Sequence, residues 1–366
     1  MSNRTTVASG LIPDELVAAL NDDANRRRID SGTARIAGCR PIFEQFDPSA
    51  KNSSVFLAVA ARWCDITDAG PEPIRKMLAT YDEAARSRFS VADYVRVRMA
   101  EGMVALKEDH LDKAIEDFEI ALKLADQASA ADVLALSNYW TGRCLRRKGK
   151  YEDALKYVRK GREIQFSRGH VHCSAAMRVL EGLILVETDE SKAAIEQLRA
   201  AEAVLIETDD YITLGNIQST YGRTLQREGH YRQAIEHYSR AIEHFQKRDT
   251  KGAHIARAEV DASFTRIQVA RHLRRNIDVY AVDRQKNTGR PSARAVQVKE
   301  LAKLSEAVLA NLDRAASIYE RCKDVRGLAR VHLYRGLLRH VVGELDLAMQ
   351  EATKAYASAE SKQDIF

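Results

Sequence analysis

The chain has 366 residues, with 57 Lys and Arg against 52 Asp and Glu, and a formal charge of +5 at pH 7. Hydrophobic residues make up 45% of it, which is typical of a folded protein and excludes a disordered chain. No apolar run approaches the roughly 20 residues of a membrane-spanning helix. The five cysteines never form a Cys-x-x-Cys pair, and residues 1–20 lack the apolar core of a secretory signal, so we expect a cytoplasmic protein.

The placement of proline predicts an all-α fold. All six prolines lie outside residues 74–290, and proline breaks the interior of a helix. Strand signals such as Asn-Gly hairpins and alternating Val, Ile and Thr are missing. At the N-terminal end we expect capping helices within residues 1–53, followed over residues 54–88 by a degenerate helical hairpin in which Arg62 stands where later repeats have glycine.

Residues 89–250 predict four regular repeats with a period of 40 residues. Each has an alanine, a glycine twelve residues before it and a bulky residue four after it. The glycines are Gly102, Gly142, Gly182 and Gly222, the alanines Ala114, Ala154, Ala194 and Ala234, and the bulky residues Phe118, Val158, Leu198 and Tyr238. This pattern predicts helical hairpins in which small residues let two helices approach closely and the bulky residue fills the space between them.

The pattern continues less regularly toward the C-terminal end. A fifth repeat, residues 251–325, is expected to hold a basic insertion at 273–300 between its two helices, and a sixth repeat covers 326–366. Residues 271–303 contain nine Lys and Arg but three Asp and Glu, a net charge of +6, so the remaining chain is nearly neutral. The last residues echo the segment before earlier first helices, and we expect a chain truncated where another repeat should begin.

These residues resemble the tetratricopeptide repeat (TPR), most clearly over residues 221–245, which include a Gly-x-Tyr turn at Gly229. The aromatic residue that the family has four positions before the glycine is absent. The period is longer than the family's standard one, and such long repeats look like those of kinesin light chains and of bacterial regulators that sense peptides or partner proteins. The resemblance implies a right-handed α-solenoid of antiparallel helix hairpins whose first helices line a concave groove.

At the family's groove positions the resemblance implies an apolar patch flanked by arginines. Guanidinium groups hold carboxylates in bidentate pairs, so the implied partner is a protein segment with an apolar anchor and acidic neighbours. The alternative is that arginine is simply a soluble helix former that pairs with Glu on the next turn. The expected groove residues are Tyr139, Arg143, Arg146, Arg147, Val179, Leu183, Val186, Asn216, Arg223, Arg227 and Arg266.

The basic insertion offers a second surface, for nucleic acid or another anionic partner, although a solvated loop is the favoured interpretation. Tyr280 is its only aromatic residue, which gives little support to base stacking. Its candidate contact residues are Arg274, Arg275, Arg284, Lys286, Arg290 and Arg294.

Patterns of catalysis and metal binding are missing from the sequence. There is no Gly-rich phosphate loop, HExxH or GxSxG. His170, His172 and Cys173 could hold a soft metal, yet no second pair lies near them, and a polar turn is favoured. Asp209 and Asp210 are expected to cap a helix start. We therefore expect no enzyme, cofactor or metal, but an adaptor, scaffold or sensor module that binds a partner protein, or a regulatory region of a longer signalling protein.

Overall fold

The regular elements of the protein are helices throughout the part that the structure describes. The computed structural model describes residues 12–128, 130–282 and 293–360, and all eighteen elements in them are helical. The predicted all-α fold is confirmed. The chain divides into a first unit that ends at Asp210 and a second unit that begins at Tyr211, between the third and fourth regular repeats.

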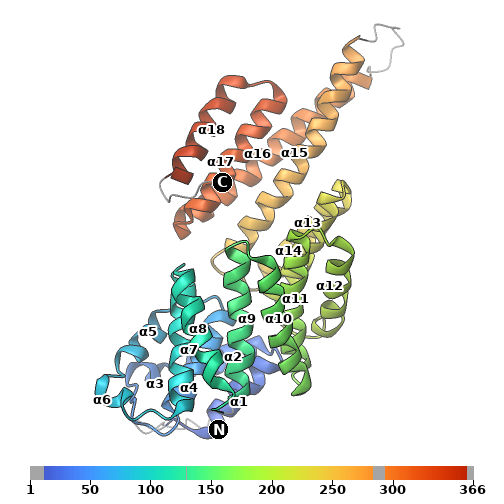
Figure 1. Cartoon of the computed structure of the whole chain (residues 1–366). Coiled ribbons are helices and arrows are strands. Elements are labelled where there is room, and N and C mark those ends of the chain that lie inside the picture. The colour runs from blue at the N-terminus through green and yellow to red at the C-terminus, as the bar shows by residue number, and fades with distance from the viewer. Residues whose placement is uncertain (1–11, 129, 283–292, 361–366) are drawn as a thin grey trace, which may run out of the picture. The chain divides into compact units, whose positions relative to one another are not determined.

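The first unit ends in three antiparallel helix pairs. Its helices are α1 (Asp14–Asn25), α2 (Ile29–Gly38), α3 (Arg40–Glu44), α4 (Ser53–Ile66), α5 (Glu72–Ala79), α6 (Glu83–Arg86), α7 (Val91–Lys107), α8 (Leu111–Ala125), α9 (Ala131–Arg147), α10 (Tyr151–Ser167), α11 (Val171–Glu187) and α12 (Ser191–Leu205). The pairs are α7 with α8, α9 with α10 and α11 with α12 (Figure 1). Helix α1 packs on α2, α4 and α11.

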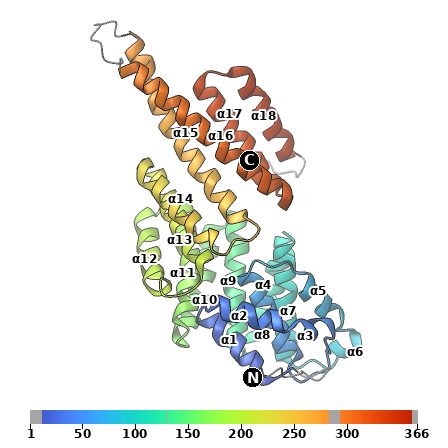
Figure 2. The ribbon, with the colours of Figure 1, turned by 180° about the vertical axis from the view of Figure 1, so that it is seen from behind.

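The second unit consists of three further antiparallel pairs. Its helices are α13 (Tyr211–Arg227), α14 (Tyr231–Gln246), α15 (Ala253–Val282), α16 (Ala293–Cys322), α17 (Val325–Val342) and α18 (Leu345–Glu360). Each helix packs on its successor in chain order, and α15 and α16 form a long hairpin (Figure 2). The predicted architecture of successive helix hairpins is confirmed.

The helix starts keep the 40-residue period of the sequence. The first helices of the four regular repeats begin at Val91, Ala131, Val171 and Tyr211, and the second helices begin at Leu111, Tyr151, Ser191 and Tyr231. Between the two helices of each repeat, one residue has a positive φ: 67° at Asp109, 72° at Gly149, 61° at Asp189 and 82° at Gly229. Glycine and aspartate therefore make the same left-handed turn in alternate repeats.

The packing inside each pair follows the predicted mechanism. A Cβ atom built on Gly142 would lie 2.4 Å from Val158 Cγ2, and one on Gly102 would lie 2.6 Å from the Phe118 ring. The alanines of the repeat are fully buried, as are the bulky residues that face the glycines. The glycine therefore holds the space that the bulky side chain fills, as the sequence predicts.

The fifth pair differs from the predicted insertion. Both of its helices are 30 residues long, and the described part of the basic segment continues them instead of forming a loop from residue 273. The reason is that Ile277 and Leu301 are buried between the two helices, and that no proline or glycine interrupts residues 274–282. The basic segment therefore also contains the buried apolar residues that hold a helical hairpin together.

Candidate functional site

The predicted groove residues lie on the first helices of both units, and each unit forms its own surface. Tyr139, Arg143, Arg146 and Arg147 lie on α9, Val179, Leu183 and Val186 on α11, Asn216, Arg223 and Arg227 on α13, and Arg266 on α15. Of the predicted basic residues, Arg274 and Arg275 on α15 and Arg294 on α16 are exposed. The other three, Arg284, Lys286 and Arg290, lie outside the described residues.

Arg143 forms an ion pair with Asp65, which lies at the end of α4. Trp140 donates a hydrogen bond from Nε1 to the second oxygen of the same carboxylate, at 2.9 Å. Burial tends to raise the pKa of Asp65, but Arg143 and Lys107 outweigh it and hold that pKa below its usual range. Asp65 is thus an anion that joins α4 to α9. The guanidinium group of Arg143 therefore already has a carboxylate partner within the protein.

Tyr139 lies beside Arg143 on α9. The Arg143 guanidinium carbon is 5.8 Å from the centre of the Tyr139 ring, within the range of a cation–π contact. Burial raises the pKa of the Tyr139 hydroxyl. Arg27, in the turn between α1 and α2, lies close to Tyr139 of α9 and Cys173 of α11. The turn of this N-terminal hairpin therefore reaches the α9 and α11 face.

Two aspartates just before α13 hold the N-terminal hairpin. Arg27 donates to Asp210 Oδ2 at 2.6 Å, and the two side chains are 12% and 3% exposed. Asp209 accepts from the backbone N–H groups of Ile29 and Asp30 at 2.7 and 2.6 Å, at the start of α2. Asp209 thus caps the start of α2, some 180 residues away along the chain, whereas the sequence predicts a cap for the helix that directly follows the pair.

The predicted apolar patch on α11 is mostly inaccessible. Val179 and Val186 are 4% and 0% exposed, and only Leu183 is partly exposed. The prediction that all three form an open anchor site is wrong for the two valines, because they pack into the protein interior. Arg147 on α9 pairs with Asp109 at 2.5 Å, so a second predicted groove arginine also has an acidic partner within the first unit.

In the second unit, three successive first helices contribute to one cluster of side chains. Arg223 of α13 lies 3.6 Å from Asp261 of α15, and Arg330 of α17 pairs with the same carboxylate. Phe264 and Tyr334 stack with ring centres 4.9 Å apart, and the Arg330 guanidinium lies 5.6 Å from the Tyr334 ring centre. We call these five residues the α13–α15–α17 cluster.

The charges of this cluster are fixed by one another. Burial tends to raise the pKa of Asp261, but Arg330 and Arg223 outweigh it and lower that pKa. Burial lowers the pKa of Arg266, which also lies on α15. Glu259 tends to raise that pKa and Arg314 tends to lower it, and the net change is downward. Arg223 and Arg330 keep 27% and 33% of their side chains exposed, so the cluster is open to a ligand.

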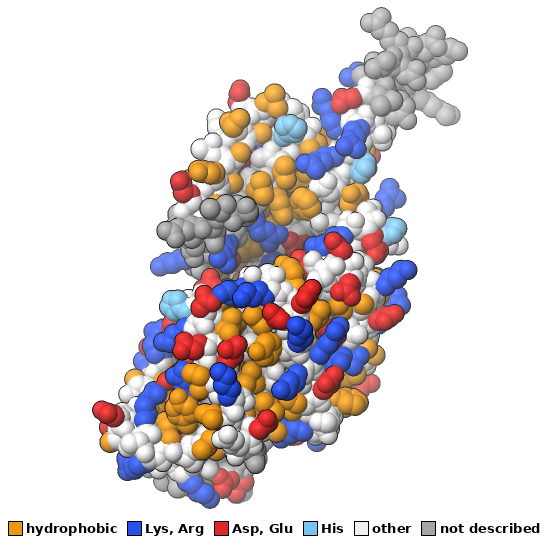
Figure 3. Space-filling view, viewed as in Figure 1, with side chains coloured by type: hydrophobic (Ala, Val, Ile, Leu, Met, Phe, Trp, Pro, Cys, Tyr) orange, Lys and Arg blue, Asp and Glu red, His pale blue; other side chains and the backbone are white. Residues whose placement is uncertain are grey.

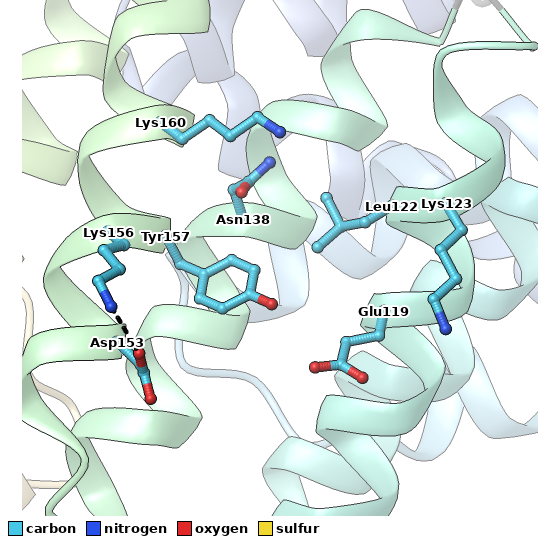
Figure 4. Close-up of a pocket in the computed structure, with 8 residues that line it drawn as sticks. All are labelled: Glu119, Leu122, Lys123, Asn138, Asp153, Lys156, Tyr157 and Lys160. Carbon is cyan, nitrogen blue, oxygen red and sulfur yellow. Dashed lines mark hydrogen bonds and ion pairs between the residues drawn. The ribbon is translucent and has the colours of Figure 1, made fainter.

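A further cleft lies between α8, α9 and α10 in the first unit, and none of the predicted groove residues lines it. Its volume is about 580 Å³, and its lining residues are Glu119, Leu122, Lys123, Asn138, Asp153, Lys156, Tyr157 and Lys160 (Figure 4). Lys156 pairs with Asp153 at 3.1 Å. Three lysines and two acidic side chains line this cleft, so their charges nearly balance and give it no clear preference for a charged ligand.

Hydrophobic side chains are exposed on the last helix pair (Figure 3). Leu345, Met349 and Tyr356 follow one face of α18 and are 63%, 70% and 67% exposed. Leu333 of α17 is 39% exposed. No helix among the described residues combines the length and the apolarity needed to cross a bilayer.

Sequence reasoning missed the acidic partners and the N-terminal contacts. Asp65 forms an ion pair with the predicted groove residue Arg143, and Asp261 forms one with Arg223. Arg330 and Tyr334 complete the second-unit cluster. One sequence signal could have revealed other ion pairs between adjacent repeats, because opposite charges recur at separations slightly below the repeat period. Such pairs are Arg147 with Asp109, Lys148 with Asp112, Arg168 with Asp132 and Lys107 with Asp68, at separations of 38, 36, 36 and 39 residues.

Comparison with known proteins supports the fold. No protein-family model and no curated protein matches the sequence. Among solved structures, a Rap protein complexed with Competence and Sporulation Factor has a TM-score of 0.66 at 13% identity, over 96% of this chain and 87% of that one. The chain has the tetratricopeptide repeat fold.

Two further solved structures are similar to this TPR-like chain. NprR in complex with its cognate peptide NprX has a TM-score of 0.59 at 11% identity, over 95% of this chain and 87% of that one. The Cut9–Hcn1 structure from the APC/C has a TM-score of 0.59 at 13% identity, over 94% of this chain and 52% of that one. At these identities the likeness concerns the fold.

Proposed function

We propose that this chain is a non-catalytic adaptor or sensor module that binds a segment of a partner protein through its first helices. The observation that carries this proposal is the α13–α15–α17 cluster. It places two arginines, an aspartate and two stacked aromatic rings on three successive first helices, and the arginines and the rings remain partly exposed.

The composition of the cluster suits peptide capture. Tyrosine and arginine are enriched among the residues that contribute most to binding at protein interfaces. Asp261 holds both guanidinium groups in place, so a ligand carboxylate would meet arginines that are already ordered. The partly exposed side chains of Phe264 and Tyr334 would contact the apolar side chain beside that carboxylate.

The similar structures support the same class of function. The Rap protein was solved with Competence and Sporulation Factor, and NprR with its cognate peptide. Both chains share the fold of this protein over nearly its whole length. A TPR-like array that binds peptides is therefore the simplest function for a chain with this fold and this cluster.

Selection of peptides on the intact chain tests the proposal. A phage-displayed library of random peptides is expected to yield binders that combine an acidic and an apolar residue. Tyr334→Ala and Phe264→Ala should each weaken these binders by about tenfold or more, as measured by fluorescence anisotropy.

The matched control is Tyr356→Ala on α18, which removes a ring of the same kind from a second helix. This variant should bind like the wild type. The proposal is rejected if the library yields no binder, or if the binders respond to Tyr356→Ala and ignore Phe264→Ala and Tyr334→Ala.

The α15–α16 hairpin supports a second candidate function, the binding of an anionic partner such as nucleic acid. Arg274, Arg275 and Arg294 are exposed near the facing ends of the two long helices, and of these Arg274 pairs with Asp278 at 3.2 Å. Binding through these residues should weaken steeply with salt. A gel shift that persists in Arg275→Gln/Arg294→Gln, or that is indifferent to salt, would reject this candidate.

A further inference from the structure

A small cleft in the first unit contains an arginine that has no counter-ion among the described residues. The cleft has a volume of about 170 Å³ and lies between α1, α4, α7 and α9, beside the residue that follows α10. Three arginines line it, Arg62, Arg96 and Arg168, and its apolar walls include Val59, Met99 and Leu136. All of these residues belong to the first unit, so the cleft is a different site from the α13–α15–α17 cluster.

Arg62 is the unusual member of this set. It is 3% exposed, and its Nη2 donates to Asn25 Oδ1 at 2.7 Å and to Cys173 Sγ at 3.3 Å. Its Nη1 is buried without a hydrogen-bond partner among the described residues. A buried guanidinium group without an anion is costly, whereas pairing with a carboxylate would offset that cost.

The other two arginines already have acidic partners. Arg168 pairs with Asp132, which also lines the cleft. Arg96 lies 3.8 Å from Asp93 and 3.4 Å from Ser54 Oγ. Because these aspartates balance Arg96 and Arg168, the charge of Arg62 remains available for a ligand. Asn25 and Cys173 fix the position of its guanidinium group, so little ordering is needed on binding.

We infer that this cleft binds a carboxylate carried on a short apolar group, the form in which the C-terminal residue of a peptide presents itself. Arg62 would take the carboxylate, and Val59, Met99 and Leu136 would contact the apolar side chain. The cleft is smaller than the roughly 300 Å³ at which sites for drug-sized ligands begin, so it suits a single residue. In the C-terminal residue the carboxylate and the side chain share one carbon atom, which matches a charged group set directly against apolar walls.

Binding of three small probes to the full-length chain tests this inference. N-acetyl-leucine carries the α-carboxylate beside an apolar side chain, N-acetyl-leucinamide lacks the charge, and N-acetyl-glutamic acid α-amide carries the carboxylate on the side chain. By NMR titration, N-acetyl-leucine should bind at least about tenfold more tightly than either other probe. Equal binding of the leucinamide or of the glutamate probe overturns the inference, as does equal binding of inorganic phosphate.

Two variants locate the binding. Arg62→Met keeps most of the apolar stem and removes the charge, and it should weaken N-acetyl-leucine at least about tenfold. Ala58→Met fills part of the cleft and should weaken the same probe while leaving Arg62 in place. The control Arg40→Met removes an exposed arginine of α3 and should bind normally.

The inference fails if a folded Arg62→Met protein binds N-acetyl-leucine like the wild type. If that variant does not fold, Ala58→Met decides, and unchanged binding there also overturns the inference. Loss of the peptides selected for the second-unit cluster would not affect these outcomes, because the small probes address the first unit alone.

Discussion

At the scale of single residues, the turn inside each regular repeat shows how two residue types meet one backbone requirement. Gly149 and Gly229 have φ values of 72° and 82°, and Asp109 and Asp189 take 67° and 61° at the equivalent positions. Left-handed backbone costs an L-residue roughly 1–2 kcal/mol, and aspartate and asparagine tolerate it best after glycine. The sequence shows the turn motif in two repeats, whereas the structure shows the same conformation in all four.

Substitutions of Gly229 should show how well different residue types tolerate the left-handed turn. Gly229→Ala is expected to lower the free energy of unfolding by about 1–2 kcal/mol, because alanine is strained at this φ and nothing around it compensates. Gly229→Asn should lower it by less. Urea denaturation measures both, and equal losses in the two variants would contradict this explanation.

His170 provides a pH-dependent contact in the first unit. Its Nε2 lies 3.3 Å from Asn25 Nδ2, and its Nδ1 lies 2.6 Å from Gln165 Oε1, which fits a neutral ring that accepts from Asn25 and donates to Gln165. Burial lowers the pKa of His170, and Arg168 lowers it further. The unfolded chain therefore binds this proton at a higher pH than the folded chain does, and stability should fall as the pH drops below about 6.5.

His170→Asn removes this titration. Wild type should lose more stability than the variant between neutral pH and the pKa of the folded-state ring, because only the wild type has a buried ring to protonate. Urea denaturation at a series of pH values measures the difference. Parallel pH profiles for the two proteins would show that His170 does not contribute.

At the scale of the helix pair, a glycine is required where a side chain would collide with the partner helix. It is replaceable where the space beside it is open. A Cβ atom on Gly161 of α10 would lie 2.7 Å from the carbonyl oxygen of Ala135 on α9, a backbone atom that cannot move aside easily. Gly161→Ala should therefore destabilise the first unit by about 1–3 kcal/mol despite the better helix propensity of alanine.

Gly38 is the matched control for this prediction. It ends α2, it is exposed, and a Cβ atom there would meet nothing within 4 Å. Gly38→Ala should leave stability unchanged or raise it by less than about 1 kcal/mol, because only helix propensity acts. If thermal unfolding shows the same change for both variants, the close approach of α9 and α10 is not what requires Gly161.

The elements themselves were largely predictable from the sequence. Gly142, Ala154 and their equivalents recur every 40 residues because they lie where the two helices of each repeat touch. The helices themselves recur with the same period. The continuation of α15 to Val282 was not predicted, because charge dominates the sequence there while the buried side chains that hold the hairpin are few. Helix ends follow packing more closely than they follow composition.

The candidate site was harder to predict, since a groove position does not reveal its neighbours. Arg143 meets Asp65 from a degenerate repeat 78 residues earlier, and Arg223 meets Asp261 from the next repeat. Val179 and Val186 stand at positions that face a groove in the family, yet both are buried here. The pairing of arginine with aspartate is a property of adjacent repeats, and no single helix contains it.

At the scale of the whole first unit, the Arg27–Asp210 pair joins its two ends. Asp210→Ala should remove the carboxylate that pairs with Arg27, and breaking a largely buried ion pair costs about 3–5 kcal/mol. Hydrogen exchange in α1, α2 and α11 should increase, since these helices meet around Arg27. Glu44→Ala removes an acid from an exposed pair with Arg40 and should change little. Unaltered exchange in α1 and α2 of Asp210→Ala would contradict this role.

The same ion pair affects the order in which the chain folds. Repeat arrays consist mainly of contacts between neighbours in sequence, which form quickly and can propagate from any repeat. The contact between Arg27 and Asp210 spans 183 residues, so its closure has a high contact order. During synthesis at about 5–20 residues per second, the N-terminal hairpin would emerge roughly 10–40 s before Asp209 and Asp210 exist to hold it. The α1–α2 hairpin is therefore expected to dock last, after the repeats that receive it have formed.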